Sequence, residues 1–136
     1  KLAGCPAIIG DIGSATNYDV VDENGAFIGG AIAPGPETAA RNLFEKAALL
    51  NDTAFTVPTS AIGRDTATNL QSGIMLGAID IIDGMFTRIQ SETGWGNPHI
   101  IITGGFGEMI SPHLGTAHTL ISTLTQDGIR IIYEQQ

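Results

Sequence analysis

Cysteine, basic residues and long apolar runs are all scarce in this chain of 136 residues. The single cysteine, Cys5, excludes an internal disulfide, and one thiol cannot build a structural zinc site. Six Lys and Arg stand against fourteen Asp and Glu, a net charge of −8, which disfavours nucleic acids and anionic membrane surfaces as partners. No apolar run approaches the ~20 residues that span a bilayer. We therefore expect a cytoplasmic protein that binds neither nucleic acid nor membrane.

The composition that remains is that of a folded protein. Hydrophobic residues make up 43% of the chain and charged residues 15%, so enough apolar surface exists to build a core. A chain of this length has room for one core rather than two. We expect a single domain over residues 1–136.

The first part of the sequence predicts a three-stranded antiparallel meander over residues 7–9, 14–21 and 26–33. An Asn24-Gly25 pair marks the turn between the last two strands. Pro36 suits the first position of a helix that we expect to run to about residue 50. Residues 51–62 read as a loop, with one short strand at 54–57 as an alternative.

The second part predicts alternating helices and strands. Apolar residues at helical spacing indicate a long helix over residues 66–94, in which Gly73, Gly77 and Gly84 suggest close packing against another backbone. A buried strand over 99–103, a short helix to 110, a strand near 119–121 and a last helix follow. A capping box at residues 123–126 opens that helix, whose Ile129, Ile132 and Tyr133 are expected to face inward. This order predicts an α/β fold of the ribonuclease-H-like kind, with a mixed sheet flanked by helices.

The densest polar cluster follows the first strand, where Asp11, Gly13 and Ser14 stand close together. A carboxylate at a strand end, a glycine turn and a hydroxyl are suited to binding a phosphate or a cation. The same residues are also compatible with an ordinary hairpin turn.

Two further clusters carry alternatives of the same kind. Asp65 and Thr66 open the long helix, where either could act simply as a cap. Gly104-Gly105 follows a strand and could admit a nucleotide against bare backbone, although helix–sheet packing also favours glycine there. The three histidines lack the spacing of metal ligands and are expected to be structural or solvated.

Taken together and in order, residues 11–35, 62–73, 101–110 and 124–134 resemble the carboxy-terminal half of type III pantothenate kinases. The resemblance implies a domain of the acetate and sugar kinase, heat-shock chaperone and actin superfamily, in which two ribonuclease-H-like domains enclose ATP. It implies ATP and pantothenate as ligands and 4′-phosphopantothenate, the first intermediate of coenzyme A synthesis, as product.

The resemblance also implies roles for individual residues. Asp11 would contact a monovalent cation, K⁺ or NH₄⁺, and Gly13 and Ser14 would contact the phosphates of ATP, which enters with Mg²⁺. Gly104 and Gly105 match the adenosine side of the site in the family. Thr66 matches the residue that contacts pantothenate.

The family's first phosphate loop, D-x-G-N-T-N, and its G-x-D-R motif, which carries the catalytic base, are absent from this sequence. We therefore expect no catalytic base in this chain, no activity of the chain alone, and a second chain that supplies the amino-terminal half in a dimer or hetero-oligomer. Besides a truncated or proteolytic fragment of such an enzyme, the alternative is a non-catalytic regulatory or assembly subunit. Asn17 and Asp65, where the family has threonine and asparagine, favour that alternative.

Overall fold

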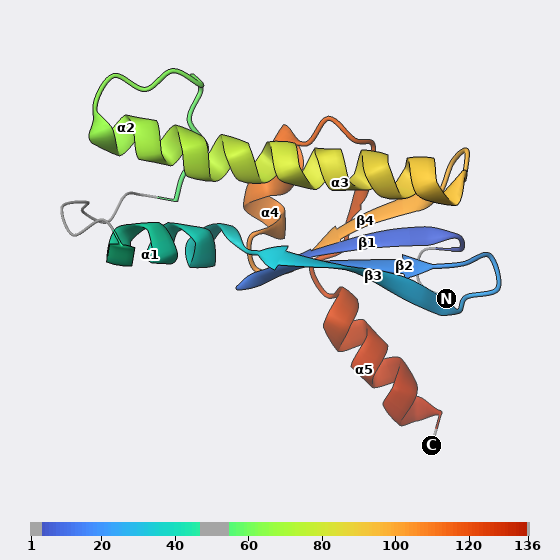
Figure 1. Ribbon diagram of the computed structural model, residues 1–136. Helices are drawn as coiled ribbons and strands as arrows, with labels where there is room; N and C mark the ends of the chain where they lie inside the picture. The colour runs from blue at the N-terminus through green and yellow to red at the C-terminus, as the bar shows by residue number, and fades with distance from the viewer. Residues whose placement is uncertain (1–3, 47–54, 136) are drawn as a thin grey trace.

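The computed structural model describes residues 4–46 and 55–135, which form a five-stranded sheet with helices mainly on one side (Figure 1). The strands are β1 (Ala7–Ile12), β2 (Ala15–Val21), β3 (Phe27–Pro34), β4 (His99–Thr103) and β5 (Thr119–Leu120). The helices are α1 (Pro36–Lys46), α2 (Thr66–Gln71), the π-helical η1 (Ser72–Leu76), α3 (Gly77–Thr93), α4 (Gly107–Ile110), the 3₁₀ turn η2 (Ser111–His113) and α5 (Leu124–Glu134).

The strand order is β3-β2-β1-β4-β5. β1, β2 and β3 pair antiparallel, while β4 is parallel to β1 and β5 is parallel to β4. This topology confirms the predicted ribonuclease-H-like α/β fold with a mixed sheet. Because β1 and β4 run in the same direction, their carboxyl ends lie at the same edge of the sheet.

The core lies between the sheet and α3. Tyr18 and Phe86 are fully buried and meet edge to face, with ring centroids 5.7 Å apart. Gly10 lies beneath them, since a Cβ there would stand 2.8 Å from Cζ of Phe86. Burial raises the pKa of Tyr18 to about 12 and keeps its phenol neutral. Alternate residues of β1, β2 and β3 therefore face α3, and the residues between them face the opposite side.

The long helix predicted over residues 66–94 is confirmed, but it is not uniformly α-helical. It begins at an Asp65 capping box, changes to the π-helical η1 and ends at Gly94 in the left-handed region at φ 69°. Within η1 the Ser72 hydroxyl donates a hydrogen bond of 2.6 Å to the carbonyl of Ala61. That bond anchors the preceding loop to the helix.

α3 also anchors the connection between η2 and β5. The Asp83 carboxylate accepts hydrogen bonds from the backbone N–H groups of Gly115 (2.8 Å) and Thr116 (2.9 Å). The His118 ring lies 2.6 Å from the Ser111 hydroxyl and 2.7 Å from the Thr116 carbonyl, so this histidine has the structural role expected of it. Burial raises the pKa of Asp83, but the hydrogen bonds and His118 outweigh it, and the pKa lies below its usual value.

Two expectations about secondary structure need correction or fall outside the described residues. Residues 55–57 form no strand, and residue 54 is not described. α1 is described as far as Lys46, so the expected end of that helix near residue 50 lies outside the described part. Within residues 4–46 and 55–135, none of the helices combines the length and the apolar character that crossing a membrane requires.

The last helix departs furthest from expectation. Thr123 makes no side-chain cap, and its hydroxyl donates instead to the Asp127 carboxylate at 2.7 Å. The expected inward residues Ile129, Ile132 and Tyr133 are 64%, 62% and 79% exposed. The reason is that α5 projects away from the sheet instead of lying on it (Figure 1). The helix has the predicted apolar residues, but nothing in the described part of the chain covers them.

Candidate active site

The turn between β1 and β2 presents Ser14 at the edge of the sheet. The Gly13 N–H donates to the carbonyl of Ala15 at 2.9 Å. The carbonyl of Ser14 accepts two hydrogen bonds, from the Gly35 N–H at 3.0 Å and from the Thr38 hydroxyl at 2.7 Å. Its own hydroxyl is exposed and forms no hydrogen bond within the described part of the chain. The backbone of the turn is fixed, while the hydroxyl remains available to a ligand.

Gly35 explains how this support is built. A Cβ at Gly35 would lie 1.9 Å from the carbonyl oxygen of Gly13, so only glycine permits the turn after β3 to approach the turn after β1. This contact was not predicted from the sequence. A contact between residues 13 and 35 leaves no local signal that could have revealed this role.

Gly104 joins the second loop to the first. Its φ of +92° is one that side chains rarely adopt, and a Cβ there would stand 2.5 Å from Oδ1 of Asp11 and 2.6 Å from the nitrogen of Ile12. The Phe106 N–H donates to the carbonyl of Ile12 at 2.9 Å. β1 and β4 pair in register, with Asp11 opposite Thr103. The structure thus brings Asp11, Gly13 and Ser14 to the same edge as the Gly104-Gly105 pair.

A cavity of about 390 Å³ opens beside this glycine pair. It is lined by Gly104, Gly105, Glu108, Ser122, Thr125 and Gln126. No atom lies within 4 Å of a Cβ built on Gly105, so bare backbone faces the opening. Its volume falls within the ~300–1,000 Å³ typical of small-molecule sites.

The sequence analysis did not predict the other residues of this cavity. Glu108 closely follows the glycine pair in the chain, whereas Ser122, Thr125 and Gln126 reach it because β5 carries the chain back alongside β4. β5 is two residues long, and so short a strand has no periodicity that could place its neighbours.

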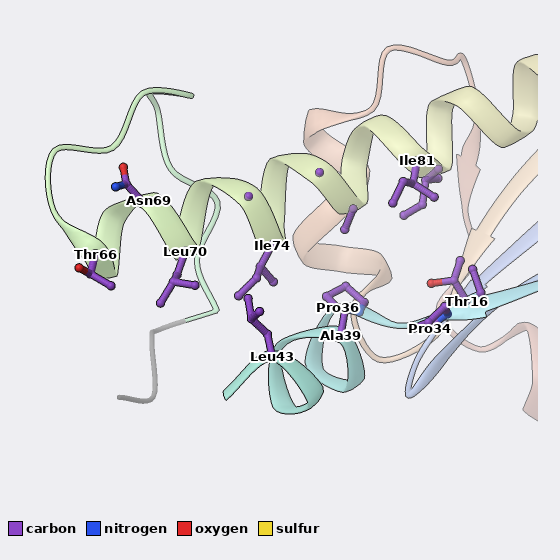
Figure 2. Close-up of a pocket in the computed structure, with 15 residues that line it drawn as sticks. Thr16, Pro34, Pro36, Ala39, Leu43, Thr66, Asn69, Leu70, Ile74 and Ile81 are labelled. Atoms are coloured by element: carbon purple, nitrogen blue, oxygen red, sulfur yellow. The ribbon is translucent and has the colours of Figure 1, made fainter. Parts of the chain in front are cut away.

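Thr66 lies in a different cavity, an apolar groove of about 660 Å³ between α1 and the long helix. Figure 2 shows Thr66 and Asn69 at one end of this groove and Thr16 at the other. Between the ends the lining is almost wholly apolar, with Leu43 of α1 lying close to Ile74. The structure therefore does not bring Thr66 into the cavity of Gly104 and Gly105.

The two glycines that line the groove make no contact that would require glycine. No atom of the described chain lies within 4 Å of a Cβ at Gly73 or at Gly77. Thr16 is 3% exposed, and its hydroxyl forms no hydrogen bond within the described residues. The groove thus presents a smooth apolar surface with one unpaired hydroxyl at its end.

Asp65 acts as the cap of α2, as the simpler of its two interpretations predicted. Its carboxylate accepts from the Thr68 N–H at 2.8 Å and the Thr68 hydroxyl at 2.9 Å. Those hydrogen bonds, the backbone one foremost, hold the pKa of Asp65 below its usual value. Arg64 is exposed and forms no ion pair within the described part of the chain; it lines a separate cavity of about 470 Å³ with Asp65.

The Asp11 carboxylate lies against the second loop, since a Cβ on Gly104 would stand 2.5 Å from its Oδ1. Across the part of the chain that the structure describes, no three His, Cys, Asp or Glu side chains converge on a point where a metal could bind. Any ion held at Asp11 would therefore need oxygen ligands from the loop backbones or from a bound ligand.

The strand order defines a ribonuclease-H-like domain, and the two loops at the carboxyl ends of β1 and β4 form its candidate ligand site. The model of the type III pantothenate kinase family matches residues 1–88. This chain therefore belongs to the type III pantothenate kinase family, as its motifs had predicted.

Individual relatives agree with this assignment. A type III pantothenate kinase of Agathobacter rectalis is 37% identical over 100% of this chain and 52% of its own length. Another from Moorella thermoacetica is 40% identical over 99% of this chain and 53% of its own length. The chain spans about half the length of the curated relatives it matches.

The fold also has a counterpart among solved structures. A crystal structure from Campylobacter jejuni, described as that of a Baf family transcriptional activator, has a TM-score of 0.65 over 98% of this chain and 58% of that protein, at 19% identity. This likeness supports the fold.

Proposed function

We propose that this chain is one half of an enzyme that uses ATP to phosphorylate pantothenate to 4′-phosphopantothenate in the cytoplasm. Membership of the family supports the reaction class. The observation that carries the proposal is the shared edge of β1 and β4, where Asp11, the free Ser14 hydroxyl and the bare Gly104-Gly105 backbone meet.

The phosphates of ATP would contact the turn between β1 and β2. The Ser14 hydroxyl is exposed and unpaired within the described residues, and Gly13 has no side chain to obstruct the ligand. The adenosine would lie on the side of Gly104 and Gly105, whose cavity has the volume of a small-molecule site. Hydroxyls and bare backbone are the groups that phosphate-binding loops use.

Asp11 would hold the monovalent cation, K⁺ or NH₄⁺. Its carboxylate packs directly against Gly104, at the place a Cβ would occupy, so the backbones of both loops lie close to it. One carboxylate supplemented by carbonyl and phosphate oxygens suits a monovalent ion, and Mg²⁺ would enter on the phosphates of ATP. The cation would offset the repulsion between this carboxylate and the triphosphate.

Thr66 would contact pantothenate. Its exposed side chain lies at one end of the groove, whereas the Asn69 amide points to the other side of the helix, toward the loop at Gly63. The contact is compatible with the capping role of Asp65, because the cap uses the backbone and hydroxyl of Thr68 and leaves Thr66 free.

The groove that Gly73 and Gly77 line would receive a second copy of this chain. Neither glycine is required by a contact within the described residues, so a close approach by another backbone would account for both. The almost wholly apolar lining also favours a protein surface over water.

The catalytic base would come from the half of the family fold that this chain does not span. Phosphoryl transfer depends on holding the γ-phosphate and the acceptor in line, with charge stabilisation from both sides. The two loops described here form one side. A chain that presents only this side should bind nucleotide weakly and transfer no phosphate.

Reconstitution tests the proposal. This chain, a chain carrying the D-x-G-N-T-N and G-x-D-R motifs, and their mixture are each incubated with pantothenate, ATP, Mg²⁺ and K⁺. We expect phosphopantothenate from the mixture alone. Product from this chain by itself would contradict the assignment of the base to the other half.

The second candidate is a non-catalytic regulatory or assembly subunit. It is favoured by Asp65, whose carboxylate puts a negative charge next to the residue proposed to contact an anionic substrate. The variant Asp65→Asn in the reconstituted mixture separates the two candidates. Phosphorylation of pantothenate by the unaltered mixture supports the kinase. If the two chains associate but form no phosphopantothenate, with Asp65 or with Asn at position 65, the result supports the non-catalytic subunit.

A further inference from the structure

α5 carries an apolar strip that nothing in the described chain covers. Ile129, Ile132 and Tyr133 are 64%, 62% and 79% exposed and lie on one side of the helix. We call these three residues the outward strip. On the other side of the helix, Leu124 and Ile131 are half-buried and face the rest of the domain.

The helix lacks the packing that would hold it in place. None of its eleven residues is buried. Isolated helices shorter than ~12–15 residues are marginal in water. Arg130 forms ion pairs with Asp127 and Glu134, and ion pairs of this kind on a helix surface add little to its stability. α5 therefore needs a surface outside the described residues.

The position of α5 indicates on which side that surface lies. Figure 1 shows α5 on the side of the sheet away from α3. The same side of the sheet carries Ile32, which is 80% exposed. Ile32 of β3 pairs with Asn17 of β2, and Asn17 pairs in turn with Asp11 of β1. Ile32 alternates with Ala31 and Ala33, which pack on the core, so it faces away from α3. The outward strip and Ile32 are two unpaired apolar features on one side of the domain.

The first turn of α5 also belongs to the proposed nucleotide cavity. Thr125 and Gln126 line it together with Gly104 and Gly105. The helix therefore starts at the proposed nucleotide cavity and then projects away from its own domain. A second domain that closed over the nucleotide would approach α5 along its length.

We infer that the outward strip of α5 docks onto the remaining half of the type III pantothenate kinase fold, the half that the relatives possess and this chain does not span. The relatives are about twice as long as the matched segment, which leaves a domain of similar size as the occupant. A second copy is disfavoured here, because the groove proposed for it lies against the long helix, across the sheet. The inference rests on the proposed function for the identity of this half.

The experiment uses a chimera in which this chain replaces the matching segment of the Moorella thermoacetica relative, so that the relative's other half is covalently present. Amide hydrogen exchange in residues 124–134 is compared between the chimera and the 136-residue chain. We expect exchange in α5 to be at least about tenfold slower in the chimera, as docking suppresses local opening. Equal exchange in the two proteins would overturn the inference.

Two matched variants of the chimera locate the contact on the helix. Ile129→Glu places a charge in the outward strip and should return α5 to the fast exchange of the chain alone. Arg130→Gln changes the neighbouring exposed position outside the strip and should leave the protection in place. Loss of protection in both variants, or in neither, would contradict docking through the strip. Circular dichroism confirms that the domain itself stays folded.

Other readouts separate this inference from the function. Protection of α5 in a chimera that forms no phosphopantothenate would support the docking and count against the kinase, while activity with an unprotected α5 would do the reverse. Sedimentation of the 136-residue chain tests the other occupant. If the chain is a dimer that Ile129→Glu converts to a monomer, a second copy covers the strip and the inference is wrong.

Discussion

Gly104 and Gly105 are adjacent, yet alanine should destabilise the fold strongly at Gly104 and hardly at all at Gly105. At Gly104 the backbone has φ +92°, and the new methyl would stand 2.5 Å from Oδ1 of Asp11 and the carbonyl oxygen of Ile12. Backbone strain of about 1–3 kcal/mol and overpacking of similar size add up to a loss of about 2–6 kcal/mol. At Gly105 no atom lies within 4 Å of the methyl, and the change should stay within about 0.5 kcal/mol.

Urea unfolding of the 136-residue chain measures the first effect. Gly104→Ala should lower the midpoint clearly with an unchanged slope, while Gly105→Ala should overlay the parent curve. In thermal melts each kcal/mol corresponds to roughly 3–5 °C for a chain of this size.

The KM for ATP should rank the two variants in the opposite order from stability. If Gly105 presents bare backbone to adenosine, Gly105→Ala should raise KM for ATP several-fold in the reconstituted enzyme and leave stability alone. A Gly104→Ala chain as stable as the parent would refute the geometric argument for Gly104. An unchanged KM for ATP in Gly105→Ala would move the adenosine elsewhere.

Four further predictions concern other parts of the chain. Asp11→Asn should abolish the K⁺ dependence of the reconstituted enzyme; normal activity of this variant, or full turnover of the parent in Na⁺ alone, would exclude a cation at this residue. Thr66→Ala should raise KM for pantothenate more than KM for ATP, and the reverse pattern would assign Thr66 to the nucleotide. Gly77→Leu should lower the mass of the assembly in sedimentation while the fold, seen by circular dichroism, persists; an unchanged mass would place the contact on another face. The folded pKa of Asp83 lies below its unfolded value, so its stabilisation is present above pH ~4 and is lost as the pH falls through the folded pKa; Asp83→Asn should flatten the acid limb of a stability–pH curve, and an unaltered limb would show that the Gly115 and Thr116 bonds contribute little.

Local signals in the sequence were enough to place the main loops. Asp11 was expected at the carboxyl end of a strand because a short apolar run precedes it, and β1 does end at Ile12. Gly104-Gly105 was expected after another strand for the same reason, and β4 ends at Thr103. The parallel pairing of two buried strands then brings both sites to one edge, which the predicted fold class already implied.

The failures arise where a residue depends on something distant in the chain. The helical pattern of 124–134 shows that one face of α5 is apolar, but a pattern does not say which surface covers that face, so the three residues expected inside are exposed. The π-helical η1 is similar. Its sequence suits an α-helix, and the wider turn accompanies the Ser72 bond to a loop residue eleven positions earlier. Neither the surface that would cover α5 nor the loop carbonyl that binds Ser72 can be predicted from the residues next to them in the sequence.

Two hydrogen bonds to the Ser14 carbonyl connect the start of α1 to the turn after β1, so these two segments should move together. Gly35 precedes the first residue of α1, and Thr38 belongs to its first turn. The same helix contributes Pro36, Ala39 and Leu43 to the wall of the apolar groove. If α1 moved and so widened or narrowed the groove, the turn that carries the Ser14 hydroxyl would therefore move with it. A partner that moved α1 on filling the groove would also shift the hydroxyl that is proposed to contact the phosphates of ATP.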